Sequence, residues 1–205
     1  MRLDKKKMIA AIIVACTTLF IAIGIHEKKD TRKQLKFGAT YMTMNNPYFV
    51  NMDENIEESV QAKGDILITR DPLQDQKKQN EQIKDMINEG IDVLFLQPVD
   101  RNKVRPALEL CKKKHIPVVV IDSEVSDTEA VVSTIVSDNY DAGVQCAKDM
   151  MKKKTSANII IVNQKALNSI NERVKGFRDT IKGHPQYKIV EEKESAAEFE
   201  ICLLY

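Results

Sequence analysis

Residues 37–49, FGATYMTMNNPYF, join a short apolar run to a polar loop that contains proline and two adjacent aromatic residues. The apolar run Phe37–Met42 is typical of a buried β-strand, and the loop Asn45–Phe49 follows directly after it. Open α/β sheets bind small ligands at the carboxyl ends of their strands. Amide and aromatic side chains at this position therefore predict a ligand-contacting loop as well as a strand-to-helix turn.

Short apolar runs alternate with helical patterns after this loop. β-Branched runs predict four further strands, at 65–69, 91–96, 116–121 and 131–136. Apolar residues spaced three and four apart predict helices over 48–62, 75–88 and 104–111. Near-continuous apolar strands are expected where helices cover both faces of a parallel sheet. Residues 37–138 therefore predict a doubly wound α/β lobe.

The same alternation of helical patterns and apolar strand patterns begins again after Asp138. The predicted elements are a helix at 141–151, a strand at 157–162, a helix at 170–181 and a strand at 187–191. This restart predicts a second α/β lobe over 139–205, with a boundary near 137–140. The second lobe has fewer elements than the first, and the sequence closes on the apolar residues ICLLY at 201–205, so we expect the second lobe to be incomplete.

The amino-terminal residues carry a membrane signal. Arg2 and three lysines at 5–7 precede an uncharged run at 8–25, which would form about 27 Å of helix and just span a bilayer. Three interpretations are open: a retained transmembrane anchor, a signal peptide cut near 22–24, or lipidation of Cys16. All three place the residues after the charged linker 26–36 outside the cytoplasm, because the basic flank stays inside.

Composition excludes several classes of function. Lys plus Arg is 31 against 30 Asp plus Glu, so nothing favours nucleic acid as a partner. No cysteine pair or histidine spacing suggests a metal site, and Cys111 and Cys146 fit small core positions. GxGxxG, GxxxxGK, GxSxG and HExxH motifs are all absent. We therefore expect neither an enzyme nor a cofactor.

Five segments occur together in a recognisable order: TMNNPYF at 43–49, QNEQIKDMINEGIDVLFLQPVD at 79–100, IPVVVIDSEV at 116–125, VSDNYDAG at 136–143 and NERVKGF at 171–177. Together they resemble the type I periplasmic binding proteins of bacterial sugar importers, such as the ribose- and galactose-binding proteins. The resemblance covers residues 37 to about 198. It implies two Rossmann-like lobes that close by a hinge around a ligand in the cleft between them.

The resemblance also implies a set of ligand-binding residues. Asn46 matches the first-lobe amide that bonds sugar hydroxyls, and Tyr48 and Phe49 match the rings that pack on the sugar. Asp122 matches the acceptor for a pair of hydroxyls, and Arg173 matches the donor from the second lobe. A sugar presents hydroxyls at its rim and C–H groups on its faces, so an amide, a carboxylate, a guanidinium and rings suit it chemically.

Each of these residues also fits a structural role. Asn46 suits the cap of the helix that begins near Tyr48, since Asn is a favoured cap. Tyr48 and Phe49 suit core positions at a helix entry, and we expect at least one of them to face the cleft. Asp122 suits a turn after a strand, and Arg173 suits a solvated helix position. Residues 137–139 are interpreted as a hinge turn.

The sequence departs from the family at three points. Ser123, also taken as a candidate contact, stands where ribose-type members have Arg, and Met42 stands where they have a small polar residue. Ribose itself is therefore in doubt, and a hexose, another pentose or a furanose stays open. The further cleft residues of the family's carboxyl-terminal part are not found in residues 1–205, which favours a truncated copy.

The expected function is an extracytoplasmic solute-binding protein that delivers a monosaccharide or similar polyol to an ABC-type permease. A second interpretation is a membrane-anchored sensor module for a kinase or chemoreceptor, and a third is a non-functional remnant. A sugar-responsive repressor shares this fold, but the membrane segment 8–25 occupies the place of its DNA-binding part.

Overall fold

The structure, a computed structural model, describes residues 32–195; residues 1–31 and 196–205 lie outside that part of the chain. The predicted membrane segment 8–25 and the apolar end 201–205 fall outside it. In chain order the elements are β1 (Lys36–Thr40), α2 (Pro47–Gln61), β2 (Ile66–Arg70), α3 (Gln76–Asn88), β3 (Val93–Leu96), α4 (Arg105–Lys113), β4 (Val118–Ile121), β5 (Val131–Ile135), α5 (Asn139–Lys153), β6 (Ala157–Asn163), α6 (Asn168–Ile181) and β7 (Tyr187–Glu194).

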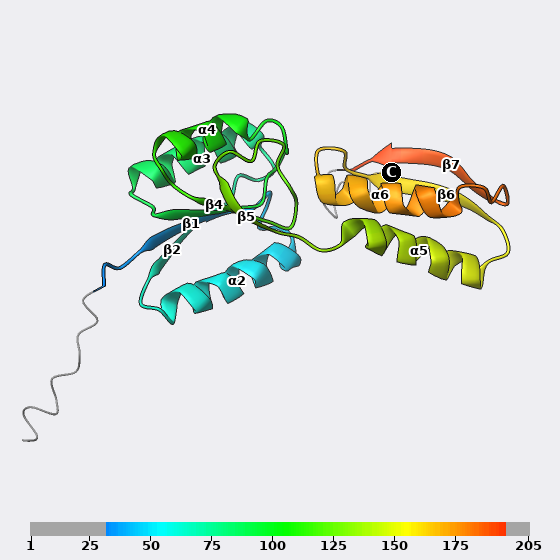
Figure 1. The fold of residues 1–205 in the computed structure, drawn as a ribbon, viewed down its shortest axis with the longest axis horizontal. Helices are drawn as coiled ribbons and strands as arrows, with labels where there is room; N and C mark the ends of the chain where they lie inside the picture. Colours follow the sequence, from blue (N-terminus) through cyan, green and yellow to red (C-terminus); the bar gives the residue numbers. More distant parts are fainter. Residues whose placement is uncertain (1–31, 196–205) are drawn as a thin grey trace, which may run out of the picture. The chain divides into compact units, whose positions relative to one another are not determined.

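The first sheet is parallel and has five strands in the order β2-β1-β3-β4-β5. Helix α2 lies on one face of this sheet, and α3 and α4 lie on the opposite face (Figure 1). The chain therefore begins inside the sheet at β1, with β2 on one side and β3, β4 and β5 on the other. This is the predicted doubly wound α/β architecture, and it brings the loops after β1, β3 and β4 to one edge of the sheet.

An apolar core fills each side of the first sheet. On the side of α3 and α4, the predicted stripe Ile83, Met86 and Ile87 packs on strand residues such as Leu94. On the side of α2, Phe49 joins a second cluster with residues of β1 and its following loop. Burying one such side chain contributes about 1.5–3 kcal/mol, so the two clusters hold the sheet and its helices together.

Two buried glutamines fix the loops at the carboxyl edge of this sheet. Gln79 of α3 donates to the Gln97 carbonyl at 2.9 Å and accepts from the Val99 amide at 3.0 Å. Gln97 in turn accepts from the Met42 amide at 2.6 Å. Because buried backbone groups must find partners, these side chains replace strand hydrogen bonds where β1 and β3 end.

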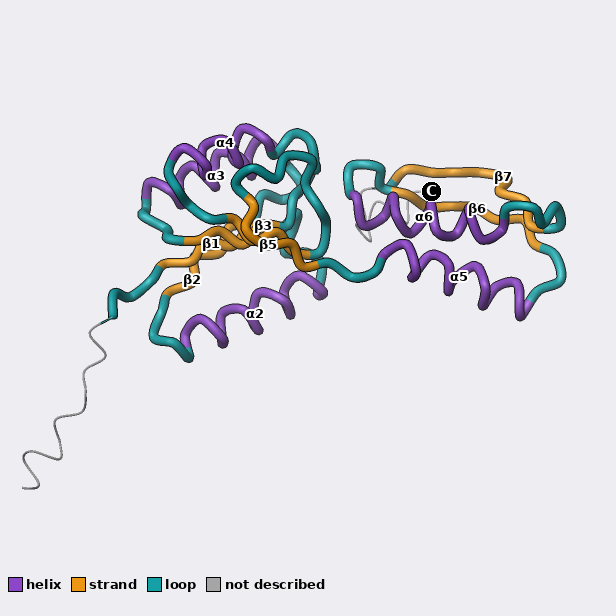
Figure 2. The backbone as a smooth tube through the Cα atoms, viewed as in Figure 1, coloured by secondary structure: helices purple, strands orange, loops and turns teal. Residues whose placement is uncertain are grey.

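The second sheet contains β6 and β7, which pair in parallel (Figure 2). Side chains from α5, α6 and the two strands form a third apolar cluster around Ala147, Ile181 and Tyr187. Ile160, Val162 and Val190 of the same strands are exposed within the described residues. We call these three residues the outer face of β6–β7.

Helices α5 and α6 approach each other very closely at two glycines. A Cβ atom on Gly143 of α5 would lie 2.0 Å from the Arg173 carbonyl oxygen of α6. A Cβ atom on Gly176 of α6 would lie 2.1 Å from the Tyr140 carbonyl oxygen of α5. Real Cβ atoms never approach an oxygen this closely, so only glycine allows the two backbones to touch at both points.

The two predicted core cysteines behave differently. Cys111 is fully buried in α4, and burial raises the pKa of its thiol to about 12. Cys146 is exposed, so its predicted core position is wrong. The face of α5 that packs on α6 contains Gly143 and Ala147, and Cys146 lies at the margin of that face.

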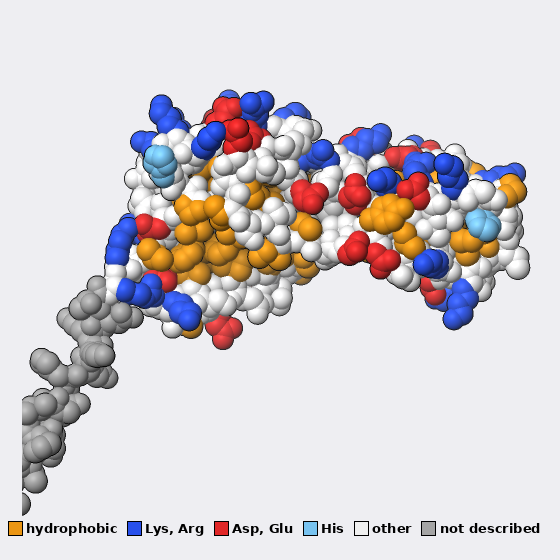
Figure 3. Space-filling view, in the orientation of Figure 1, with side chains coloured by type: hydrophobic (Ala, Val, Ile, Leu, Met, Phe, Trp, Pro, Cys, Tyr) orange, Lys and Arg blue, Asp and Glu red, His pale blue; other side chains and the backbone are white. Residues whose placement is uncertain are grey.

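We use first lobe for residues 34–138 and second lobe for residues 139–195. Both lobes belong to a single compact unit that begins at Gln34, so the predicted domain boundaries stay a prediction. Hydrophobic side chains gather on the first-lobe face seen in Figure 3. Strand β5 forms one edge of the first sheet and exposes Val132 and Ile135. Between residues 32 and 195 no helix combines the length and apolar composition that a bilayer span requires.

Candidate functional site

The loop after β1 starts helix α2 and presents one aromatic ring. Asn46 caps this helix, because its side chain accepts from the Tyr48 amide at 3.0 Å, and Pro47 at the first position has no N–H to satisfy. Phe49 is only 4% exposed and stacks on Tyr41 with 5.9 Å between ring centroids. Tyr48 is 53% exposed. Of the two predicted rings, Tyr48 is therefore the one that offers surface to a ligand.

Asp122 directly follows β4 in a strained backbone conformation. Its φ is 64°, in the left-handed region that few residues other than Gly, Asn and Asp adopt. Its amide donates to the Ile135 carbonyl at 2.9 Å, which fixes the turn at the end of β4. Strain of this kind is often found at functional sites, where surrounding structure holds it in place. This turn therefore fixes the direction in which the Asp122 side chain leaves the end of β4.

Tyr48 and Asp122 interact through their side chains. The pKa of the Tyr48 phenol is raised mainly by burial and further by the nearby Asp122 carboxylate. The pKa of Asp122 is raised by burial, while the nearby Tyr48 phenol and the charge of Arg173 partly oppose that shift. The pair therefore brings the hydroxyl and ring of Tyr48, at the start of α2, close to the Asp122 carboxylate in the turn after β4.

Arg173 comes from α6 in the second lobe and reaches toward this pair. Its charge opposes part of the rise in the pKa values of Tyr48 and Asp122, which indicates that the guanidinium lies near them. Its Nε donates to the Asn139 side-chain oxygen at 2.9 Å. The structure thus brings together three of the predicted residues, one acceptor, one donor and one ring, across the two lobes.

Ser123, the residue after Asp122, lies in the protein interior. It is fully buried, and its Oγ accepts from the Ser169 amide of α6 at 3.3 Å. Ser123 therefore connects the lobes rather than presenting its hydroxyl to an open site. Its role as a ligand contact stays a prediction.

Further polar contacts between the lobes were not predicted from the sequence. Asn168 at the start of α6 bonds to Arg101 and to Glu124, which lie in the loops after β3 and β4. The Arg101 amide donates to the Ala166 carbonyl at 3.2 Å. No local spacing links these residues, so only the tertiary fold reveals that they meet. Their arrangement holds the strand-end loops of both lobes against each other.

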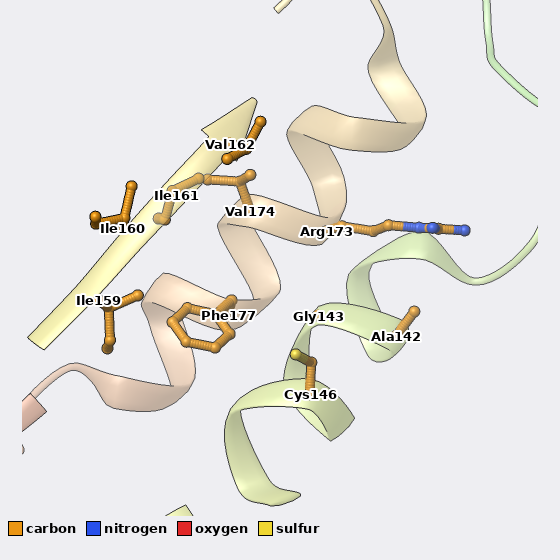
Figure 4. A pocket seen from close by; sticks show the side chains of 10 residues that line it. All are labelled: Ala142, Gly143, Cys146, Ile159, Ile160, Ile161, Val162, Arg173, Val174 and Phe177. Atoms are coloured by element: carbon orange, nitrogen blue, oxygen red, sulfur yellow. The ribbon is translucent and has the colours of Figure 1, made fainter. Parts of the chain in front are cut away.

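An apolar pocket of about 390 Å³ lies between α5, α6 and β6. Its walls include Ile161, Val174, Phe177 and the exposed Cys146 (Figure 4). The Arg173 side chain points away from these apolar residues (Figure 4). Apart from Arg173, the residues that line this pocket carry no hydrogen-bonding or charged side chain other than the Cys146 thiol, so it offers few of the polar groups that a sugar needs. Among residues 32–195 no group of His, Cys, Asp and Glu side chains is arranged to hold a metal ion.

Parallel α/β sheets that direct polar strand-end loops toward each other define a class of small-ligand-binding proteins. Residues 37–200 match the family model described as periplasmic binding protein domain. The match covers most of the chain, so the chain belongs to this family. The family consists of solute-binding proteins rather than enzymes, and it implies an extracytoplasmic location.

Curated relatives include ribose- and galactofuranose-binding proteins. The ribose import binding protein RbsB of Bacillus subtilis is 28% identical over 149 residues, which are 69% of this chain and 48% of that protein. The galactofuranose-binding protein YtfQ of Escherichia coli is 26% identical over 144 residues, or 67% of this chain and 45% of that protein. This chain spans about half the length of these relatives.

Solved structures show the same fold. An ABC transporter solute-binding protein from Mycobacterium smegmatis with bound glycerol has a TM-score of 0.73 at 30% identity, covering 78% of this chain and 56% of that one. The myo-inositol binding protein of Caulobacter has a TM-score of 0.77 at 21% identity, covering 84% of this chain and 59% of that one. The predicted type I binding-protein fold is confirmed for the matched part.

Proposed function

We propose that this protein binds a neutral monosaccharide, or a similar small polyol, between Tyr48, Asp122 and Arg173. The observation that carries this proposal is that the Asp122 carboxylate and the partly exposed Tyr48 side chain of the first lobe lie near the Arg173 guanidinium of the second. These groups come from different strand-end loops and helices, so the two lobes would bind one small molecule together.

Each group suits one part of a sugar. The Asp122 carboxylate accepts hydrogen bonds from neighbouring hydroxyls, and the Arg173 guanidinium donates to ring or hydroxyl oxygens. The exposed ring of Tyr48 covers C–H groups on a sugar face. A buried polar group left unpaired costs about 1–3 kcal/mol, so a sugar with one hydroxyl reversed would bind more weakly.

The surrounding charge favours an uncharged ligand. Asp122 and Arg173 offset each other, and the nearby cavity at the start of α5 is lined by Glu124, Asp138 and Glu172. This acidic rim repels a sugar acid or a sugar phosphate. A neutral polyol meets neither repulsion nor an uncompensated charge.

The curated relatives support a role in import, because they are named as import binding proteins or sugar-binding proteins. We therefore propose that the ligand is delivered to an ABC-type permease outside the cytoplasm. A sensor role is the second candidate, because a fructose-binding periplasmic domain of a hybrid two-component system has the same fold, with a TM-score of 0.74. Mass spectrometry of the mature amino terminus separates them: a retained segment 8–25 favours the sensor, and a cleaved or lipidated end favours import.

Calorimetric titration tests the binding proposal directly. The purified chain is titrated with D-ribose, D-xylose, D-galactose, D-glucose, L-arabinose and myo-inositol. We expect binding of at least one of them, weakened about 10–100-fold by Asp122→Asn because a charge-assisted hydrogen bond contributes about 1.5–3 kcal/mol. Asp149→Asn is the matched control, since that carboxylate pairs with Lys153 on exposed α5. Absence of heat with every sugar would contradict the proposal and favour a non-functional remnant.

A further inference from the structure

Asn139 is the first residue of α5 and lies where the chain passes from the first sheet to the second lobe. It is only 7% exposed. Its side-chain oxygen accepts from Arg173 Nε at 2.9 Å, across 34 residues of sequence. This buried amide is therefore in direct contact with the guanidinium that faces the Tyr48–Asp122 pair.

The backbone of Arg173 is held against the same helix. The Arg173 carbonyl packs on Gly143, one turn after Asn139, so that even a Cβ atom has no room between them. The reciprocal contact at Gly176 and Tyr140 lies one turn further along α6. Because both backbones are fixed at these points, the arginine side chain begins from a defined position, and only its own torsions stay free.

The hydrogen bond to Asn139 removes much of that remaining freedom. An arginine side chain has about 2 kcal/mol of rotamer entropy to lose when it is ordered. With Nε bonded to Asn139, the guanidinium plane is set while both terminal nitrogens keep their N–H groups. Arg173 is one of the residues that line the apolar pocket, and its side chain extends away from Ile161 and Phe177 (Figure 4).

An amide at this position differs from a carboxylate in the number of hydrogen bonds that it accepts from the guanidinium and in its charge. A carboxylate would bind the guanidinium by two parallel hydrogen bonds and occupy one of its terminal nitrogens. Asn139 accepts only through its single oxygen and carries no charge. Asn139 therefore adds no charge that offsets the guanidinium, and the two terminal nitrogens stay available to another partner.

We propose that Asn139 is a positioning residue that orients the Arg173 guanidinium so that its terminal nitrogens face a ligand held at Tyr48 and Asp122. This inference rests on the proposed function of that site. It assigns to the segment 137–139, which the sequence indicates only as a hinge turn, a second role in ligand recognition. The residue at the crossing between lobes then also determines the direction of the second lobe's hydrogen-bond donors.

The orientation itself is measured without any sugar. In ¹⁵N-labelled protein, the Arg173 Nε–H signal is assigned by its loss in Arg173→Lys. We expect this proton to exchange slowly with water in the unmodified chain and at least about 10-fold faster in Asn139→Leu, which keeps the side-chain size but lacks the acceptor. Asn139→Asp keeps an oxygen at the same place and should preserve slow exchange. Equal exchange rates in Asn139→Leu and the unmodified chain would overturn the inference.

Sugar affinity gives the second readout, using the sugar of the calorimetric panel that binds most tightly. We expect Asn139→Leu to weaken binding about 10-fold, and to have no further effect when Arg173 is already Lys, because the two residues act through one hydrogen bond. An equal loss in both backgrounds would show that Asn139 acts independently of Arg173 and would overturn the inference. If no sugar binds, the proposed function fails, and the exchange measurement still decides whether Asn139 orients Arg173.

Discussion

The two sheets of this protein differ in how they are covered. The first has helices on both faces, with α2 on one side and α3 and α4 on the other (Figure 1). The second has α5 and α6 in its apolar cluster, while the outer face of β6–β7 is exposed among the described residues. The first lobe is therefore stabilised mainly by sheet burial, and the second mainly by contact between two helices.

The largest expected effect is the loss of stability when a buried residue of the first sheet is truncated, compared with an exposed residue of the second. Leu94 of β3 is fully buried between helices, and Ile160 of β6 is 59% exposed. We expect Leu94→Ala to lower the free energy of unfolding by about 3–5 kcal/mol, because it leaves a cavity. Ile160→Ala should cost about 0.5 kcal/mol, since little packing is lost. Urea denaturation followed by circular dichroism measures both, and similar losses would show that the outer face is covered in solution.

A medium effect tests the helix contact of the second lobe. Gly143→Ala improves intrinsic helix propensity but forces α5 away from the Arg173 carbonyl. We expect it to lower the free energy of unfolding by about 1–3 kcal/mol. Ala142→Gly, on an exposed position of the same helix, costs about 1 kcal/mol from propensity alone. A stabilised Gly143→Ala variant would mean that α5 and α6 lie further apart than the structure shows.

The smallest effect concerns the edge where the two lobes meet. Burial raises the pKa of Asp122, so the folded state holds this proton more tightly than the unfolded chain does. The contribution of Asp122 to stability is therefore full below its ordinary pKa and is lost as pH rises through the raised value. Asn tolerates the same left-handed backbone. We expect Asp122→Asn to raise the melting temperature by about 1–3 °C at pH 7 and to have no such effect near pH 3.

Scanning calorimetry at both pH values measures this difference, with Asp149→Asn as the exposed control. A lower melting temperature of Asp122→Asn at pH 7 would show that the charged form is favoured in the folded protein, through Arg173 and Tyr48, rather than disfavoured by burial.

Most of the fold could be predicted because parallel strands and amphipathic helices have strong periodic signals. The predicted strand at 91–96 begins later, at Val93, since Ile91 and Asp92 belong to the turn after α3. The Asp92 carboxylate there accepts from the Lys36 amide at 2.9 Å, a contact between distant residues that no local pattern contains. The strand order β2-β1-β3-β4-β5 was not part of the prediction and is known only from the structure.

The site could be predicted only in part. Asn46 was expected either to bind ligand or to cap α2; the structure confirms the cap, and ligand binding stays a prediction. The left-handed backbone of Asp122 gives no signal in composition or spacing. The pairing of Asn139 with Arg173 depends on how two helices cross, which sequence periodicity does not specify.

The strand order has a consequence for synthesis of the chain. β1 is made first, yet it lies inside the sheet, with β2 on one side and β3 on the other. The side of β1 that pairs with β3 therefore stays unpaired until residues 93–96 have been synthesised, roughly 3–10 seconds later at ordinary rates of translation. During that interval the nascent chain presents an unpaired apolar strand, a form that chaperones recognise and that other nascent chains can join.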